Sequence, residues 1–156
     1  MEQGVNALEE RYSSNDPREV ERVYKFSNEE IMRWMRTRPS AKIEVKREAN
    51  GDVVVVIPTK SVNSPLAREA REVFKPLPVV FVESSGKYFN YARSVNAGIE
   101  RVMEYRPKWV VVSNDDVHKV DDAKKLVDAL ATTNRVLVMA RPSAYHTYQG
   151  VHCEAH

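Results

Sequence analysis

Five consecutive β-branched residues, Val53 to Ile57, constrain the fold of this chain more than any other feature. A strand with one face in water alternates apolar and polar residues, whereas a strand covered on both faces is apolar throughout. The run is also far too short to cross a membrane. It therefore predicts a central strand over 52–57, buried on both faces within a sheet.

Strand and helix patterns alternate regularly after this run. Strand ends fall near residues 57, 82, 112 and 139, about 25 to 30 residues apart, which is the length of a strand–helix–strand crossover unit. The expected helices cover 65–75, 91–105 and 121–131, with Ser64 and Asp121 as caps, and the expected strands cover 79–82, 109–112 and 135–140. Such units build an α/β fold, a mostly parallel, doubly wound sheet with flanking helices.

Residues 1–50 are richer in charge and poorer in apolar runs than the rest, and we interpret them as an extension to a domain over 51–156. Asp16 followed by Pro17 predicts one helix start. Ser27 with Glu30 forms a capping box that predicts a second. This extension is therefore expected to begin with two helices.

The dipeptide Asn50-Gly51 is a strong type I′ turn signal. It predicts a hairpin that joins a strand over 42–47 to the central strand, so that the added strand packs beside the core sheet. Residues 33–47 also carry six basic groups against one acid. These are interpreted either as a solvated helix end and edge strand or as a patch for an acidic partner or membrane phosphates.

Composition excludes several classes of protein. Subtracting 22 acidic from 24 basic residues leaves a net charge of +2, which argues against a nucleic-acid binder that works by bulk charge. The single cysteine, Cys153, forms no internal disulfide. The N-terminus lacks the basic and apolar segments of a signal peptide. We therefore expect a cytoplasmic protein with no nucleic-acid partner.

Polar clusters follow three of the predicted strands, at 58–61, 83–87 and 113–116. In open α/β sheets, ligands bind beyond the carboxyl ends of the strands. Because parallel strands end at the same edge, these clusters are expected to meet there. The sequence therefore predicts one ligand site built from all three.

The triplet Asn114-Asp115-Asp116 is the strongest single signal in these clusters. Adjacent carboxylates repel each other and are stabilised by a divalent cation, and oxygen ligands suit Mg²⁺ or Mn²⁺. The alternative is a turn with helix-capping acids. Because Asp121 is available to cap the next helix, the triplet is less necessary as a cap, which favours a site.

The predicted helix over 91–105 contains residues that suit an ordinary helix poorly. Asn96 and Gly98 both lower helix propensity, and Gly98 suggests close packing of the helix on the sheet. Arg93 lies near the helix start, where the helix dipole disfavours a cation unless an anion compensates. The alternative is a surface arginine on a helix with normal packing.

Four segments together resemble the nucleotide-binding half of a GT-A-fold glycosyltransferase, closest to glycosyltransferase family 2. They are residues 54–59, 80–86, 92–99 and 109–117. Their order and spacing also match, and the resemblance covers roughly residues 52–141. It implies a Rossmann-like core and an inverting enzyme that uses Mn²⁺ or Mg²⁺. Such an enzyme transfers sugar from a nucleotide diphosphate sugar to an acceptor, which is a glycan, lipid or protein.

The resemblance also implies roles for nucleotide-binding residues. Pro58 and Thr59 fall where the first strand of the family meets the base and ribose. Glu83 stands where the family usually has an aspartate that contacts the nucleobase, so that the carboxylate is kept but lengthened. Arg93 and Asn96 fall on a segment that lines the nucleotide pocket.

The family's metal-binding triplet corresponds to residues 114–116. By resemblance, Asp116 binds the metal directly, with Asn114 in place of a first aspartate, and Asp115 faces the ribose or the sugar. Asp115 and Asp116 are therefore the expected catalytic residues. A leaving nucleoside diphosphate gains negative charge, which a metal on Asp116 and a cation such as Arg93 would stabilise.

An inverting enzyme also needs a carboxylate base, and here the family pattern is incomplete. Only 40 residues follow Asp116, and Glu154 is the only acid after Asp128. Two alternatives therefore stay open. One is a non-catalytic nucleotide-binding or interaction module, and the other is a metal-dependent phosphoryl-transfer enzyme or nuclease.

Residues 1–50 are expected to cover the sheet, to pair two chains or to contact a membrane surface.

Overall fold

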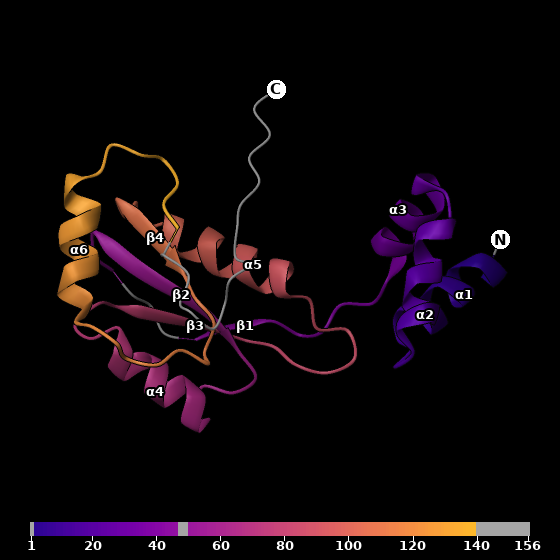
Figure 1. Ribbon diagram of the computed structural model, residues 1–156, viewed down its shortest axis with the longest axis horizontal. Coiled ribbons are helices and arrows are strands. Elements are labelled where there is room, and N and C mark those ends of the chain that lie inside the picture. Colours follow the sequence, from indigo (N-terminus) through magenta and orange to yellow (C-terminus); the bar gives the residue numbers. More distant parts are fainter. Residues whose placement is uncertain (1, 47–49, 140–156) are drawn as a thin grey trace. The chain divides into compact units, whose positions relative to one another are not determined.

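The computed structural model describes residues 2–46 and 50–139 (Figure 1). The described residues fall into two compact units, one up to Ala123 and the other from Lys124 onward. The helices are α1 (Glu2–Tyr12), α2 (Pro17–Glu21), the 3₁₀ helix η1 (Arg22–Lys25), α3 (Asn28–Thr37), α4 (Pro65–Val73), α5 (Tyr91–Met103) and α6 (Ala123–Thr132). The strands are β1 (Glu44–Lys46), β2 (Val53–Thr59), β3 (Val79–Glu83) and β4 (Trp109–Val112).

The fold is α/β, with a four-stranded mixed sheet in the order β1-β3-β2-β4. Strand β2 pairs in parallel with β3 on one side and with β4 on the other, while β1 is antiparallel to β3. All seven residues of β2 are buried. The prediction of a central strand covered on both faces is therefore confirmed.

Alternating side chains of β2 and β3 enter two separate cores, because successive residues of a strand point to opposite faces. On one face, Val54, Val56, Val80 and Val82 pack with Val102 of α5. The other face is formed by Val55, Ile57, Val79 and Phe81, which pack with Ala67 and Ala70 of α4. The two helices therefore cover opposite faces of the sheet (Figure 1).

Gly98 allows α5 to approach the sheet closely. A Cβ atom built at this position would lie 2.5 Å from a Val56 methyl and 2.7 Å from a Val82 methyl. Carbon atoms that are not bonded prefer separations of about 3.5–4.0 Å. The expected close packing at Gly98 is confirmed, and no larger residue fits without movement of the sheet.

The capping signals at Asp16, Ser27 and Ser64 gave correct helix starts, whereas α6 begins at Ala123, two residues after the predicted cap Asp121. The Asp16 side chain accepts from the Arg18 N–H at the start of α2, and Ser27 and Glu30 form the predicted capping box of α3. Ser64 Oγ accepts from the Ala67 N–H at 3.0 Å. Helix α5 is capped by Asn90, whose Oδ1 accepts from the Arg93 N–H at 2.9 Å.

The predicted hairpin is wrong. Strand β1 pairs with β3, where Val45 faces Val82, and does not pair with β2. Both edges of β2 are already occupied by β3 and β4, so the free edge of β3 is where an added strand can find hydrogen-bond partners. Residue 47 of the predicted strand lies outside the described residues.

The predicted strand over 135–140 is also wrong for its described part. Residues 135–139 have no strand structure, and Val136 is 98% exposed. Apolar β-branched residues raise strand propensity, but a strand also needs a neighbour for its backbone hydrogen bonds. Residue 140 and Glu154, the only acid after Asp128, lie outside the described residues.

The N-terminal helices enclose a small core of their own. Leu8, Val23 and Trp34 are buried there, and Phe26 and Ile31 pack against them. Leu8 belongs to α1, a helix that the sequence patterns did not predict. The segment before β1 is therefore packed structure, although Tyr24, Met32 and Met35 of the same helices stay exposed.

Candidate functional site

A cavity of about 560 Å³ lies at the carboxyl ends of the parallel strands. Residues from all three predicted polar clusters line it, together with side chains from α4 and α5. The lining residues are Pro58, Thr59, Lys60, Leu66, Ser84, Ser85, Gly86, Phe89, Tyr91, Asn114, Asp115 and Asp116. The fold thus brings together segments that are up to 58 residues apart, counted from Pro58 to Asp116.

A hydrogen bond joins the ends of β2 and β4 at the centre of this site. Thr59 Oγ1 donates to Asp115 Oδ2 at 2.7 Å, and the Thr59 side chain is buried. From β2 the chain moves to β3 on one side and returns through α5 to β4 on the other. Strand order reverses at this point, and in open α/β sheets such a reversal is where ligands bind. Thr59 therefore orients one carboxylate at the position that topology favours for a ligand.

Asp116 is exposed, and its charge acts on Tyr91 at the start of α5. Burial raises the pKa of the Tyr91 phenol above its ordinary value, and the negative charge of Asp116 raises this pKa further. Tyr91 is therefore a neutral hydrogen-bond donor at physiological pH. The cavity combines this donor with two carboxylates.

The oxygen donors at this edge of the sheet suit a divalent cation whose remaining coordination positions are filled by a bound ligand. Asn114, Asp115, Asp116 and Thr59 supply amide, carboxylate and hydroxyl oxygens to one cavity. Across residues 2–46 and 50–139, no three His, Cys, Asp or Glu side chains gather as a metal-binding group. Mg²⁺ is commonly held by one or two carboxylates, with waters and substrate phosphates completing the shell. The donor set therefore suits a cation bound jointly with a phosphate, and does not suit an all-protein cage.

Ser84 contributes a buried hydroxyl to the cavity wall. The residue is 6% exposed, and its Oγ finds no hydrogen-bond partner within the part of the chain that the structure describes. An unpaired buried hydroxyl costs about 1–3 kcal/mol, and most such groups in native proteins are satisfied by protein, water or ligand. A hydrogen bond gained by Ser84 Oγ, from water or from a ligand that shifts the wall, would recover that cost.

The sequence patterns placed Lys60 in the 58–61 cluster but gave no role to it or to two aromatic lining residues. Lys60 supplies the positive charge among the described lining residues, directly after the buried end of β2. Phe89 and Tyr91 flank Asn90, the cap of α5. The cap signal at Asn90 would have placed the start of α5 beside the other clusters and so marked both aromatic residues.

Three predicted nucleotide-binding residues lie outside the main cavity. Glu83 Oε2 accepts from the Val62 N–H at 2.9 Å. Glu83 also lines a neighbouring cavity of about 190 Å³, which shares Lys60, Ser84 and Ser85 with the first. Arg93 and Asn96 are exposed on α5 and do not line either cavity. The main cavity brings together five of the predicted site residues: Pro58, Thr59, Asn114, Asp115 and Asp116. Glu83, Arg93 and Asn96 do not line it.

In the described part of the chain, no helix is both long and apolar enough to span a membrane. No protein-family model, no curated protein and no solved structure matches the chain.

Proposed function

We propose that this chain is a metal-dependent glycosyltransferase that binds a nucleotide diphosphate sugar in the cavity at the carboxyl ends of β2, β3 and β4. The observation that carries the proposal is the Thr59–Asp115 hydrogen bond, which joins β2 and β4 where strand order reverses. Asn114 and Asp116 line the same cavity. Its volume falls within the range of small-molecule sites, about 300–1,000 Å³.

Five of the described lining residues have a role in the proposed reaction. Transfer forms a bond between an acceptor hydroxyl oxygen and the anomeric carbon of the sugar, and the proton of that hydroxyl is lost to solvent. The bond between the anomeric carbon and the β-phosphate oxygen breaks, and the leaving nucleoside diphosphate takes the electron pair. Asp116 and Asn114 would hold Mn²⁺ or Mg²⁺, which supplies positive charge to the leaving diphosphate. Lys60 offsets the same charge, and Asp115, oriented by Thr59, accepts a hydrogen bond from a ribose or sugar hydroxyl.

Binding is tested by the melting temperature of the chain with UDP, GDP, CDP or ADP, each with Mn²⁺ or with EDTA. A ligand at one hundred times its Kd stabilises the folded state by about 2.7 kcal/mol. At about 2–4 °C per kcal/mol for a chain of this size, the melting temperature should rise by about 5–11 °C. We expect such a rise for one nucleotide and only with the metal.

The matched variants are Asp116→Asn and Asp128→Asn. Both remove one carboxylate charge, but Asp128 is an exposed residue of α6 that does not line the cavity. Asp116→Asn should abolish the metal-dependent rise, and Asp128→Asn should leave it unchanged. The same rise in both variants, or no rise in the wild-type protein, would refute the proposal.

A non-catalytic nucleotide-binding module is the second candidate. It is favoured because the carboxylates among the described lining residues are Asp115 and Asp116, and both already have roles with the donor. No described lining carboxylate is then left to deprotonate the acceptor. The assay offers the nucleotide sugar together with glycan, lipid or peptide acceptors. Metal-dependent binding without release of the nucleoside diphosphate would identify the module, whereas its release would identify the enzyme.

A further inference from the structure

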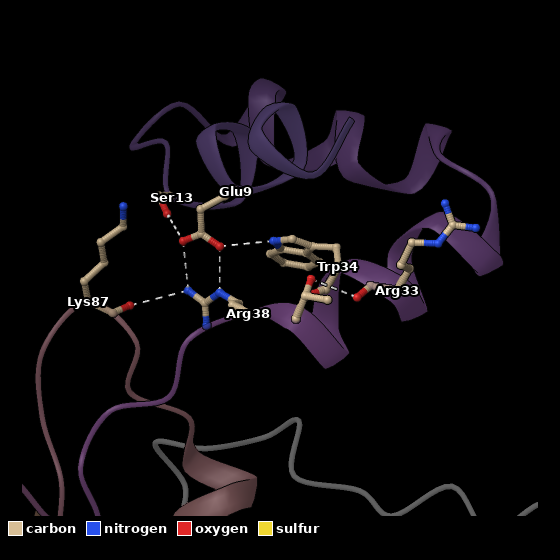
Figure 2. A network of polar contacts seen from close by, with 7 residues as sticks. Glu9, Ser13, Arg33, Trp34, Arg38 and Lys87 are labelled. Carbon is tan, nitrogen blue, oxygen red and sulfur yellow. Dashed lines mark hydrogen bonds and ion pairs between the residues drawn. The ribbon is translucent and has the colours of Figure 1, made fainter. Parts of the chain in front are cut away.

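Arg38, just after α3, forms an ion pair with Glu9 of α1 that is largely shielded from water. Arg38 Nε and Nη2 donate to the two carboxylate oxygens at 2.8 and 3.3 Å (Figure 2). The two side chains are 11% and 19% exposed. Glu9 also accepts from Trp34 Nε1 at 3.1 Å and from Ser13 Oγ at 3.0 Å. The carboxylate thus receives four hydrogen bonds and holds the guanidinium in one orientation.

Aromatic rings surround the same guanidinium. Its central carbon lies 4.9 Å from the ring centre of Tyr12 and 5.7 Å from that of Trp34, both in the N-terminal helices. It also lies 5.4 Å from the ring centre of Tyr88, which follows β3. Arginine suits such a position because its planar group stacks on rings while its N–H groups donate at the edge.

Three contacts tie this region to the segment that leads from β3 to α5. Arg38 Nη2 donates to the Lys87 carbonyl at 3.4 Å (Figure 2). The Ala41 N–H donates to the Tyr88 carbonyl at 3.2 Å. The third contact is the cation–π contact between the Arg38 guanidinium and the Tyr88 ring. All three act on residues 87 and 88.

Residues 87 and 88 sit within a turn that forms part of the cavity wall. The Phe89 N–H donates to the Gly86 carbonyl at 3.0 Å and closes the turn. Both Gly86 and Phe89 line the cavity. Gly86 has φ +97°, a conformation that residues other than glycine rarely adopt. Besides this hydrogen bond, the contacts at residues 87 and 88 hold the turn, and they therefore help to fix where Gly86 and Phe89 lie.

We propose that Arg38, oriented by Glu9, is a positioning residue that holds the 86–89 turn as a wall of the ligand cavity. The N-terminal helices thereby serve the site, although none of their residues lines it. Buried ion pairs contribute little net stability, because desolvation offsets the attraction, and their best-attested use is to specify one arrangement. The part of the proposal that concerns ligand affinity rests on the proposed function, and the part that concerns the turn does not.

Hydrogen exchange of the full-length chain tests the turn directly. In Arg38→Gln, the Phe89 amide, which donates to the Gly86 carbonyl, should exchange about tenfold faster, as expected if the variant loses about 1.4 kcal/mol of local protection. Amides of β2 should be unchanged. Arg33→Gln is the matched control, because it removes the same charge from an exposed residue of α3 (Figure 2).

A second variant keeps the test informative if Arg38→Gln disturbs the N-terminal helices. Tyr88→Leu removes the ring on the cavity side and leaves the Arg38–Glu9 pair in place. It should speed exchange of the Phe89 amide without affecting α1 or α3. If the Phe89 amide exchanges in both variants as slowly as in Arg33→Gln, the proposal is overturned.

Titration with Mn²⁺ and UDP then connects the turn to the site. We expect the Kd for UDP to rise about tenfold in Arg38→Gln and Tyr88→Leu, and to stay unchanged in Arg33→Gln. Faster exchange with an unchanged Kd would overturn the link between the turn and the ligand. If the wild-type chain does not bind UDP or another nucleotide, the proposed function fails, and the exchange experiment alone decides whether Arg38 holds the turn.

Discussion

Replacing Gly98 with alanine should destabilise the chain, although alanine is the better helix former. Gly98 lies in the middle of α5 and is buried against the sheet. The added methyl group would meet Val56 Cγ1 at 2.5 Å and Val82 Cγ2 at 2.7 Å. Both valines are fully buried in the two central strands, so neither methyl can move into open space.

The size of the effect follows from two opposing terms. Normal contact requires about 3.5 Å, so each methyl must retreat by roughly 1 Å. Overpacking of a close-packed core costs about 1–3 kcal/mol, and simultaneous overlap with two strands favours about 3. Alanine recovers about 1 kcal/mol of helix propensity. The net loss is about 2 kcal/mol, or about 4–8 °C in melting temperature.

Urea unfolding followed by circular dichroism measures this difference. Glu100→Ala is the control, because Glu100 is exposed on the same helix, and it should change the free energy of unfolding by less than about 0.5 kcal/mol. Combining Gly98→Ala with Val56→Ala should cost less than the sum of the two single changes, since the shortened valine leaves room for the new methyl. A Gly98→Ala variant as stable as the wild-type chain would refute the packing argument.

Three further predictions concern charge. Lys60→Ala should weaken UDP binding about tenfold and leave uridine binding unchanged in calorimetry, because Lys60 is proposed to act on the diphosphate; an equal loss for both ligands would contradict this role. Asp116→Asn should lower the pKa of Tyr91 part of the way to its ordinary value, because burial, the larger cause of the shift, remains. The pKa is measured by NMR titration of the tyrosine ring carbons. An unchanged pKa would show that Asp116 does not act on Tyr91. The hydrogen bond from Arg38 is the main cause that lowers the pKa of Glu9 below its ordinary 4.5. The folded state then favours the carboxylate, so its contribution is present above about pH 4.5 and is lost as the pH falls through the lower folded pKa. Between pH 3 and 6, the free energy of unfolding should therefore rise more steeply with pH in the wild-type chain than in Glu9→Gln. Equal slopes in the two proteins would argue against the Arg38–Glu9 ion pair.

Part of the candidate site could be predicted because it follows from strand topology. Thr59 and Asp115 each follow a recognisable apolar strand, and parallel neighbours end at the same edge of the sheet. Arg93 could not be placed in the same way. Its position near a helix start says nothing about the direction of its side chain, and in the structure it is exposed and lines neither cavity.

Sequence by itself determined the features that depend on nearby residues. The run from Val53 to Ile57 requires burial on both faces, because five apolar side chains in an extended chain point alternately to each side. The capping box of Ser27 and Glu30 closes within one helical turn, and the start of α3 needed no information from elsewhere.

Tertiary structure decided what depends on competition among distant segments. Whether the strand at Val45 pairs with β2 or with β3 depends on which edges are free, and β4 occupies the edge of β2 that a hairpin would have used. The apolar sequence around Val136 was not enough to form a strand in the absence of a paired neighbour. Arg38 acquires its partners from α1 and from the turn after β3, 29 and 49 residues away in the sequence. Hydrogen-bond partners at such separations are set by the packing of the whole unit, which local patterns do not encode.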